Sequence, residues 1–135
     1  MEEADSLIKK LEMISHPEGG HYVEIFKNKE VSQIYYLLKK NEKSHWHRLT
    51  KNEILHFYSG APLEVFTSSN GVDYELFSLG IDDNYIYTVK ANTWFAMRSA
   101  GSYSLIGCTV APAFDFNDFE LAPATWRPEK FKIEL

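Results

Sequence analysis

The sequence has a single cysteine, Cys108, and no long uninterrupted hydrophobic run. An intrachain disulfide is therefore impossible, and disulfide-free chains are typical of a reducing compartment such as the cytoplasm. No apolar run approaches the roughly 20 residues that a membrane-spanning helix needs. The acidic start, Met1 to Asp5, also lacks the hydrophobic core of a signal peptide. From these absences we expect a cytoplasmic protein with no membrane partner.

Basic residues are too few and too scattered for an extended nucleic-acid surface. The chain has 14 Lys and Arg against 19 Asp and Glu, which gives a net charge of −5. Nucleic-acid binding usually relies on clustered basic side chains. We therefore expect no nucleic-acid partner.

Aromatic residues, in contrast, are abundant. The chain has eight Tyr, nine Phe and three Trp, mostly in short runs with Val, Ile and Thr, and this composition favours strands over helices. Its 135 residues fit one domain, which at this length buries about two-thirds of its unfolded surface. We expect residues 1–135 to form a single domain.

One short helix is expected, at about residues 5–15. Asp5 can cap it, and Leu7, Leu11 and Ile14 recur on one helical face. The helix should stop before Pro17, because a residue that precedes proline disfavours the α conformation.

From Tyr22 onward the chain has the pattern of successive short strands. Asn70-Gly71 is the clearest hairpin turn. Strands at intervals of about 8–12 residues, without helices between them, indicate an antiparallel sandwich or barrel. The expected strands are 22–26, 32–38, 44–49, 54–58, 63–67, 73–79, 85–89, 94–97 and 103–110.

The remaining segment, about 113–135, has a different composition. Pro123 and Pro128 discourage regular structure. Phe114, Phe116 and Phe119 lie among acidic residues, and three exposed phenyl rings would be costly. We expect this segment to form a flap over a barrel of about residues 20–112, or against a second subunit.

Side chains with catalytic chemistry concentrate between Ser44 and Gly60. On a strand over 44–49, alternation puts His45 and His47 on one face, about 7 Å apart. A turn could then return Glu53 to the same mouth. Two imidazoles and a carboxylate suit either a divalent metal or acid–base catalysis.

These residues resemble the first motif of the cupin superfamily, whose members have RmlC-like jelly rolls. His45-x-His47 is followed by Glu53 and Gly60, although the His47-to-Glu53 spacing is one residue longer than usual. More specifically, the chain is similar to the uncharacterised cupin-5 branch, domain of unknown function 985. The blocks that carry this resemblance, over about residues 15–122, are His16–Gly20, Trp46–Arg48, Glu53–Phe57, Gly60–Glu64, Thr93-Trp94, Gly107–Pro112 and Phe114–Phe116.

The resemblance implies an all-β, antiparallel jelly-roll barrel with a short N-terminal helix. It also implies a cavity open at one end and, commonly, a homodimer. Relatives include sugar-nucleotide epimerases, oxygenases and isomerases, and this branch has no settled reaction. The fold alone therefore does not supply the function.

The chain departs from the cupin pattern at one metal ligand. Counting from the second-motif turn puts Phe95 where relatives carry a histidine, and a phenyl ring cannot bind a metal. His45, His47 and Glu53 remain as possible ligands for one divalent ion, Zn, Fe, Mn or Ni. Three protein ligands with water can still form such a site.

Without a metal, His47 and Glu53 would be the catalytic pair, because imidazole titrates near neutral pH and a carboxylate can orient it. Epimerase relatives pair a histidine base with a tyrosine acid. The sequence does not choose among Tyr22, Tyr36 and Tyr103 for that role.

Further ligand-binding candidates are Glu18, which could guard the cavity mouth, and Tyr22. Trp46 and Trp94 are either packing groups or cavity walls on which a sugar stacks. Arg48, opposite the two histidines by alternation, is expected in a structural ion pair, and Cys108 as an inert core thiol.

These features predict that the protein binds a small polar or anionic ligand. One hypothesis is an isomerase or epimerase that acts on a sugar-like or carboxylate substrate. The alternative is a non-catalytic protein that binds or senses a small molecule, and a third reading is an oligomeric scaffold with a vestigial cavity.

Overall fold

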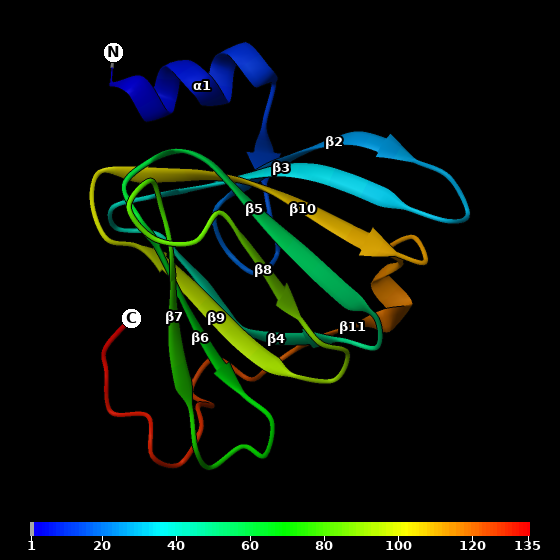
Figure 1. Cartoon of the computed structure of the whole chain (residues 1–135), viewed down its shortest axis with the longest axis vertical. Helices are drawn as coiled ribbons and strands as arrows, with labels where there is room; N and C mark the ends of the chain where they lie inside the picture. Colours follow the sequence, from blue (N-terminus) through cyan, green and yellow to red (C-terminus); the bar gives the residue numbers. More distant parts are fainter. Residues whose placement is uncertain (1) are drawn as a thin grey trace.

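The computed structural model describes residues 2–135, which form two antiparallel β-sheets packed face to face with one short helix (Figure 1). This is the expected all-β jelly-roll architecture. The two sheets are separate and do not close into one continuous barrel. None of the helices in residues 2–135 is both long and apolar enough to span a membrane.

Six strands form the first sheet, in the order β1 (Ile14–Ser15), β2 (His21–Lys27), β3 (Ser32–Lys39), β10 (Tyr103–Ala111), β5 (Asn52–Gly60) and β8 (Ile86–Val89). Five strands form the second, in the order β11 (Phe119–Leu121), β4 (Lys43–Leu49), β9 (Trp94–Ser99), β6 (Leu63–Ser68) and β7 (Glu75–Leu79). Strands adjacent in sequence therefore often lie in different sheets. In particular, β4 and β5 bring His47 and Glu53 to opposite sheets.

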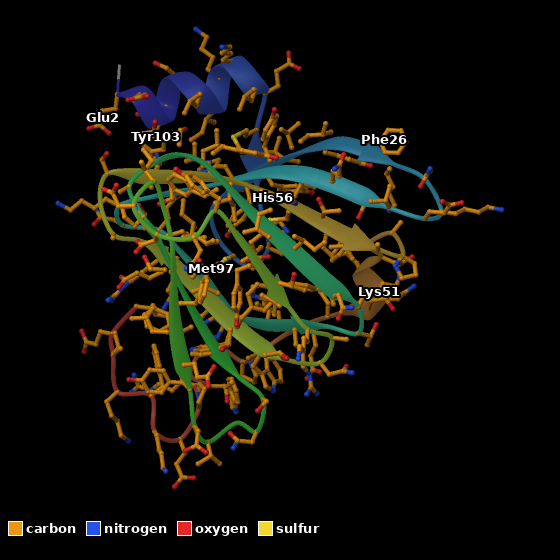
Figure 2. All side chains as sticks on the ribbon, in the orientation of Figure 1. Glu2, Phe26, Lys51, His56, Met97 and Tyr103 are labelled. Carbon is orange, nitrogen blue, oxygen red and sulfur yellow. The ribbon has the colours of Figure 1, made fainter. Side chains whose placement is uncertain are left out.

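The main core fills the space between the two sheets. Leu38 and Leu55 of the first sheet and Val65 and Phe95 of the second are at most 1% exposed. Met97, labelled in Figure 2, lies in this core, whereas Phe26 is half exposed at the far end of β2. Full burial of such a side chain contributes about 1.5–3 kcal/mol, so this layer holds the two sheets together.

The helix α1 (Glu3–Leu11) is shorter than expected and starts earlier. Glu12 ends it in a left-handed conformation with φ of 57°. Asp5 lies inside the helix rather than at its cap, and its carboxylate lies 3.3 Å from Lys39 Nζ. Leu11 packs on the outer face of the first sheet, while Ile14 leaves the helix and is 60% exposed in β1.

The hairpin predicted around Asn70-Gly71 is present, because β6 and β7 pair antiparallel with Leu63 opposite Leu79. Its connection is longer than a two-residue turn. Asn70 Oδ1 accepts hydrogen bonds from the backbone N–H groups of Val72 and Asp73, at 2.8 and 2.9 Å.

The C-terminal segment, residues 122–135, packs over the outer face of the second sheet. Phe131 is 1% exposed, and its ring centroid lies 5.1 Å from those of both Trp46 and Phe66. In Figure 1 this segment (red) runs beside β6 and β7. Residues 122–135 therefore cover the second sheet, whereas the three phenylalanines at 114, 116 and 119 of the expected flap line the cavity between the sheets.

The stretch before it is more regular than its composition suggested. The short 3-10 helix η1 (Phe116–Asp118) leads into β11, which pairs with the edge of β4. Pairing with the edge of β4 therefore gives residues 119–121 a regular structure.

Candidate functional site

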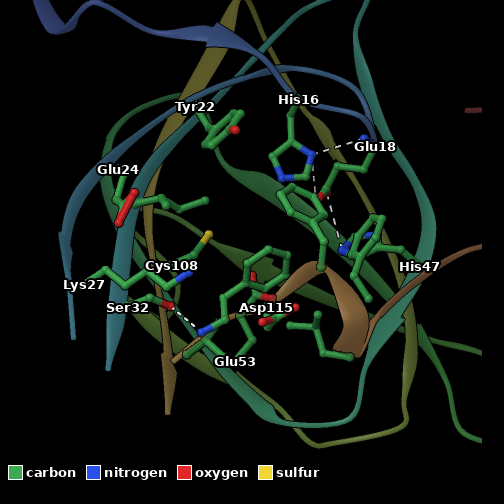
Figure 3. A pocket seen from close by; sticks show the side chains of 16 residues that line it. His16, Glu18, Tyr22, Glu24, Lys27, Ser32, His47, Glu53, Cys108 and Asp115 are labelled. Carbon is green, nitrogen blue, oxygen red and sulfur yellow. Dashed lines mark hydrogen bonds and ion pairs between the residues drawn. The ribbon is translucent and has the colours of Figure 1, made fainter. Parts of the chain in front are cut away.

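A cavity of about 310 Å³ lies between the two sheets, bordered by the aromatic segment 114–119 (Figure 3). Both sheets contribute to its wall. Its lining residues are His16, Glu18, Tyr22, Glu24, Lys27, Ser32, Ile34, His47, Leu49, Glu53, Cys108, Val110, Phe114, Asp115, Phe116 and Phe119.

An irregularity in β4 determines which of its side chains reach this cavity. The pairing of β4 with β9 shifts between Ser44 and His47, and such a bulge re-aims side chains. Ser44 Oγ and His47 Nδ1, three residues apart, therefore lie 3.5 Å from each other in the interior. In a regular strand these two residues would face opposite ways.

The same bulge turns His45 out of the site. Its Nε2–H donates to the carbonyl of Pro123 at 3.0 Å, on the side covered by the C-terminal segment. The expectation that His45 shares a face with His47 is therefore wrong, because strict alternation does not hold through Ser44–His47.

His47 is held in one orientation and one tautomer. Its Nδ1–H donates to the carbonyl of His45 at 2.7 Å, so in the neutral ring the free nitrogen is Nε2. Nε2 lies 3.4 Å from Glu18 Oε2, and the two side chains are only 2% and 8% exposed. Burial lowers the pKa of His47, an effect that the charge of Glu53 partly opposes.

Glu18 reaches this position from the His16–Gly20 connection. Gly19 has φ of 112°, and a Cβ there would collide with the carbonyl oxygen of Lys43. Only glycine suits both the angle and the close approach. The Glu18 N–H donates to His16 Nδ1 at 3.1 Å, and Ser44 Oγ donates to Glu18 Oε2.

Burial also controls the protonation of Glu18. It raises the pKa of this carboxyl, and the neighbouring His16, Ser44 and Tyr36 only partly oppose it. Since burial lowers the pKa of His47 at the same time, a protonated carboxyl beside a neutral imidazole is favoured. The pair thus offers a proton acceptor at His47 Nε2 and an acid at Glu18, 3.4 Å apart.

Glu53 comes from the opposite sheet and is 9% exposed. Burial raises its pKa from 4.5 to about 7, with a further contribution from the charge of Glu18, while His47 lowers it. Burial and the charge of Glu53 in turn raise the pKa of the Cys108 thiol well above its ordinary value. The thiol therefore stays protonated, as expected for an inert cysteine.

His16 is a site residue that the sequence reasoning used only as part of a motif. Its ring lies 4.7 Å from that of Tyr22 and 5.8 Å from that of Tyr36, between centroids. Burial lowers the pKa of His16. The sequence signal that could have identified His16 as a site residue is its position two residues before Glu18, in a turn that contains glycine.

The three tyrosine candidates are separated by the fold. Tyr22 lines the cavity. Tyr36 is buried behind it, and its hydroxyl donates to the carbonyl of Gly19 at 2.5 Å. Tyr103 lies in the cluster under α1 and donates to Glu3 at 2.8 Å.

Trp46 and Trp94 do not wall this cavity. Trp46 is 1% exposed in the outer cluster with Phe131. The Trp94 ring is tilted against that of Trp126, with centroids 4.7 Å apart, and the Arg48 guanidinium lies 4.4 Å from the Trp94 ring centroid. Both rings lie on the outer face of the second sheet. Of the two readings offered by the sequence, packing therefore holds, and a ligand-binding place for these rings in the cavity between the sheets is wrong.

Arg48 forms the structural ion pair that was expected. Its Nη2 lies 2.9 Å from Glu120 Oε1, and both side chains are partly exposed. The pair connects β11 to β4, although an exposed ion pair of this kind contributes little stability.

The residues present do not fit the metal ion considered from the sequence. His45 is turned away, and the Phe95 ring lies 4.0 Å from the His47 ring, between centroids. No three His, Cys, Asp or Glu side chains within residues 2–135 are arranged to hold a metal ion.

Three phenylalanines form the aromatic border of the cavity. The ring centroid of Phe116 lies 4.9 Å from that of Phe114 and 5.9 Å from that of Phe119. Phe119 also lies 5.7 Å from the His47 ring. This border limits access of water to the buried pair.

The sequence model of the Cupin superfamily (DUF985) matches residues 5–122. Among solved structures, protein SO0799 from Shewanella oneidensis has a TM-score of 0.86 and 34% identity, over 90% of this chain and 85% of that chain. A hypothetical protein from Leishmania major has a TM-score of 0.80 and 28% identity, over 88% and 86% of the two chains.

More distant structures share the fold alone. KdgF from Halomonas sp. has a TM-score of 0.62 and 11% identity, over 76% of this chain and 87% of that chain. No curated protein matches the chain. With its two-sheet jelly roll and a family match over residues 5–122, the chain belongs to the cupin superfamily, in the branch named domain of unknown function 985.

Proposed function

We propose that the protein is an acid–base enzyme of the isomerase or epimerase kind, acting on a small polar substrate in the cavity between the sheets. One observation carries this proposal. Glu18 Oε2 and His47 Nε2 lie 3.4 Å apart, almost fully buried at a cavity wall. Buried groups with perturbed pKa values in a cavity are typical of catalytic sites.

The second acid–base group supports a reaction with two proton transfers. Glu53 belongs to the sheet opposite His47, and its pKa is about 7. His47 Nε2 would remove a proton from a carbon next to a substrate carbonyl, and Glu18 or Glu53 would return a proton at the other position. Such acid–base steps contribute roughly 10²–10⁴-fold to the rate.

The charge of the lining favours a neutral, sugar-like substrate over an anionic one. Four carboxyl groups border the cavity, against one lysine, Lys27. Even when Glu18 and Glu53 are protonated, the exposed Glu24 and Asp115 remain as negative charges near the mouth. A volume of about 310 Å³ suits a small molecule.

Hydrogen exchange with solvent tests this reaction without knowledge of the product. The protein is incubated in D₂O with a panel of aldoses, ketoses and their carboxylate forms, and loss of carbon-bound hydrogen is followed by proton NMR. We expect exchange in at least one neutral sugar, and His47→Asn should reduce it by about 100-fold or more.

The matched control is His56→Asn. His56 lies on β5, and its Nε2 lies 3.2 Å from the hydroxyl of Thr109, away from the cavity lining. This variant should keep the exchange rate. Exchange that persists in His47→Asn would contradict the assigned base.

A non-catalytic binding or sensing protein is the second candidate. Glu18 and His47 are almost fully buried, and a buried polar pair of this kind can stabilise the fold at a cavity wall without taking part in a reaction. This burial favours the second candidate. Two results together would support this candidate over the enzyme. A sugar of the panel binds saturably, and Glu18→Gln abolishes that binding, yet no compound of the panel exchanges hydrogen with solvent.

Two further expectations belong with this proposal. The homodimer implied by the family is testable by light scattering, where a monomer mass at all concentrations would contradict it. The cytoplasmic location is testable by fractionation of cells that express the chain.

A further inference from the structure

A second cavity lies on the outer face of the second sheet, between β4 and the C-terminal segment. Its volume is about 240 Å³. Its walls are mainly aromatic and aliphatic side chains, with basic groups from both segments. The lining residues are Lys43, His45, Trp46, Ala124, Thr125, Trp126, Arg127, Phe131, Ile133 and Leu135.

The charged side chains that line this cavity are all basic. Lys43 and Arg127 contribute full positive charges, and none of the lining side chains is acidic. No carboxylate of residues 2–135 forms an ion pair with either cation. In a chain of net charge −5, an unpaired basic pair at a cavity indicates a preference for anions.

One buried donor in the same wall lacks a partner. Trp46 is 1% exposed, and its Nε1–H has no hydrogen-bond partner among residues 2–135. An indole nitrogen can only donate, and an unmet buried donor is costly. This donor lies within the wall of the cavity and is covered by protein atoms.

We propose that this outer cavity binds a small organic carboxylate with a flat or apolar body. Lys43 and Arg127, the two cations of the lining, would hold the carboxylate. The rings of Trp126 and Phe131 would contact the body of the ligand. Charge-assisted hydrogen bonds of this kind are the stronger ones in proteins.

The outer cavity is independent of the proposed acid–base site. His45 and His47 lie on the same strand, yet the bulge sends their side chains to different cavities. The inner cavity is rich in carboxyl groups and the outer cavity has none on its lining side chains. The two sites should therefore take ligands of different charge.

Titration with benzoate and benzamide tests the proposal, because the two probes share a ring but differ in charge. The assigned indole N–H resonances of the three Trp are followed by two-dimensional NMR. Benzoate should shift the Trp46 and Trp126 resonances saturably, with a Kd on the order of millimolar for a ligand of this size. Benzamide should bind at least fivefold more weakly.

Variants separate the site from general charge effects. Lys43→Gln and Arg127→Gln should each weaken benzoate binding about fivefold or more. Lys132→Gln removes the same charge from an exposed position of the C-terminal segment outside the lining, and it should change the Kd less than twofold. His47→Asn should leave benzoate binding intact, even if it abolishes the proposed reaction.

Three results would overturn the proposal. Equal binding of benzoate and benzamide would show an apolar groove without anion selectivity. An equal effect of Lys132→Gln and Lys43→Gln would show general screening. Shifts that stay linear in benzoate concentration, or that are confined to Trp94, would show that no such site exists.

Discussion

The backbone carbonyl of His45 accepts a hydrogen bond from the imidazole of His47, at 2.7 Å. Because this bond occupies Nδ1, the other ring nitrogen is left to face Glu18. The two histidines of the HxH pattern thus act in different ways: one contributes its side chain to the site and the other its backbone. The bulge between Ser44 and His47 makes this possible.

We predict that His47 is neutral at pH 7 and carries its proton on Nδ1. Burial lowers its pKa from 6.5, so the ring should stay neutral as the pH falls below 6.5. Long-range nitrogen NMR of the imidazole, assigned with His47→Asn, measures both points. A doubly protonated ring at pH 7 would contradict the prediction and would indicate an ion pair with Glu18.

We predict that Glu53→Gln gains stability relative to the wild type as the pH rises. The folded state holds the proton of Glu53 more tightly than the unfolded state, since its pKa is raised from 4.5 to about 7. The associated stability is present below pH 4.5 and is lost as the pH rises through about 7. A shift of this size corresponds to about 3 kcal/mol.

Urea unfolding, followed by tryptophan fluorescence at pH 5 and pH 8, measures this difference. Glu129→Gln is the control for loss of a carboxylate, because Glu129 is exposed. A constant effect of Glu53→Gln would mean that the carboxyl is ionised throughout this range.

The fold was predictable because its signals are local. Alternating apolar residues, aromatic-rich runs and turn residues at Asn70-Gly71 set the strands of both sheets. The convergence of His47 and Glu53 on one cavity followed from the short connection between two strands that enter opposite sheets.

The rest of the site depends on features that one sequence does not show. A bulge is a property of strand pairing, so strict alternation misplaced His45. The role of Glu18 depends on a turn that folds back onto β4, where the His45 N–H donates to the Glu18 carbonyl at 2.8 Å. His16 enters the site with it, and no periodicity marks either residue.

We predict that the protein purified without chelators contains well below one equivalent of any transition metal. His45 is turned away and Phe95 occupies a position next to His47, and no three possible ligands of residues 2–135 are arranged around one metal position. Elemental analysis tests this, and Zn²⁺ titration should leave the melting temperature unchanged, because only binding to the folded state stabilises it. A stoichiometric metal that is lost in His47→Asn would contradict the prediction.

We predict that Gly19→Ala is strongly destabilising. Gly19 has φ of 112°, and an added Cβ would meet the backbone carbonyl of Lys43, which cannot move without displacing β4. Strained backbone of this kind costs about 1–3 kcal/mol, and the collision adds to it. Gly71→Ala is the matched control, because Gly71 also has a positive φ, 74°, but its nearest neighbour would lie 3.7 Å away.

Urea unfolding of both variants should therefore show a larger loss for Gly19→Ala than for Gly71→Ala. Gly19→Ala should also disturb the resonances of His47, because the turn positions Glu18 against that ring. Equal losses for the two alanine variants would mean that the conformation of Gly19 matters and its approach to Lys43 does not. In that case the turn would not depend on β4 to hold Glu18 in the site.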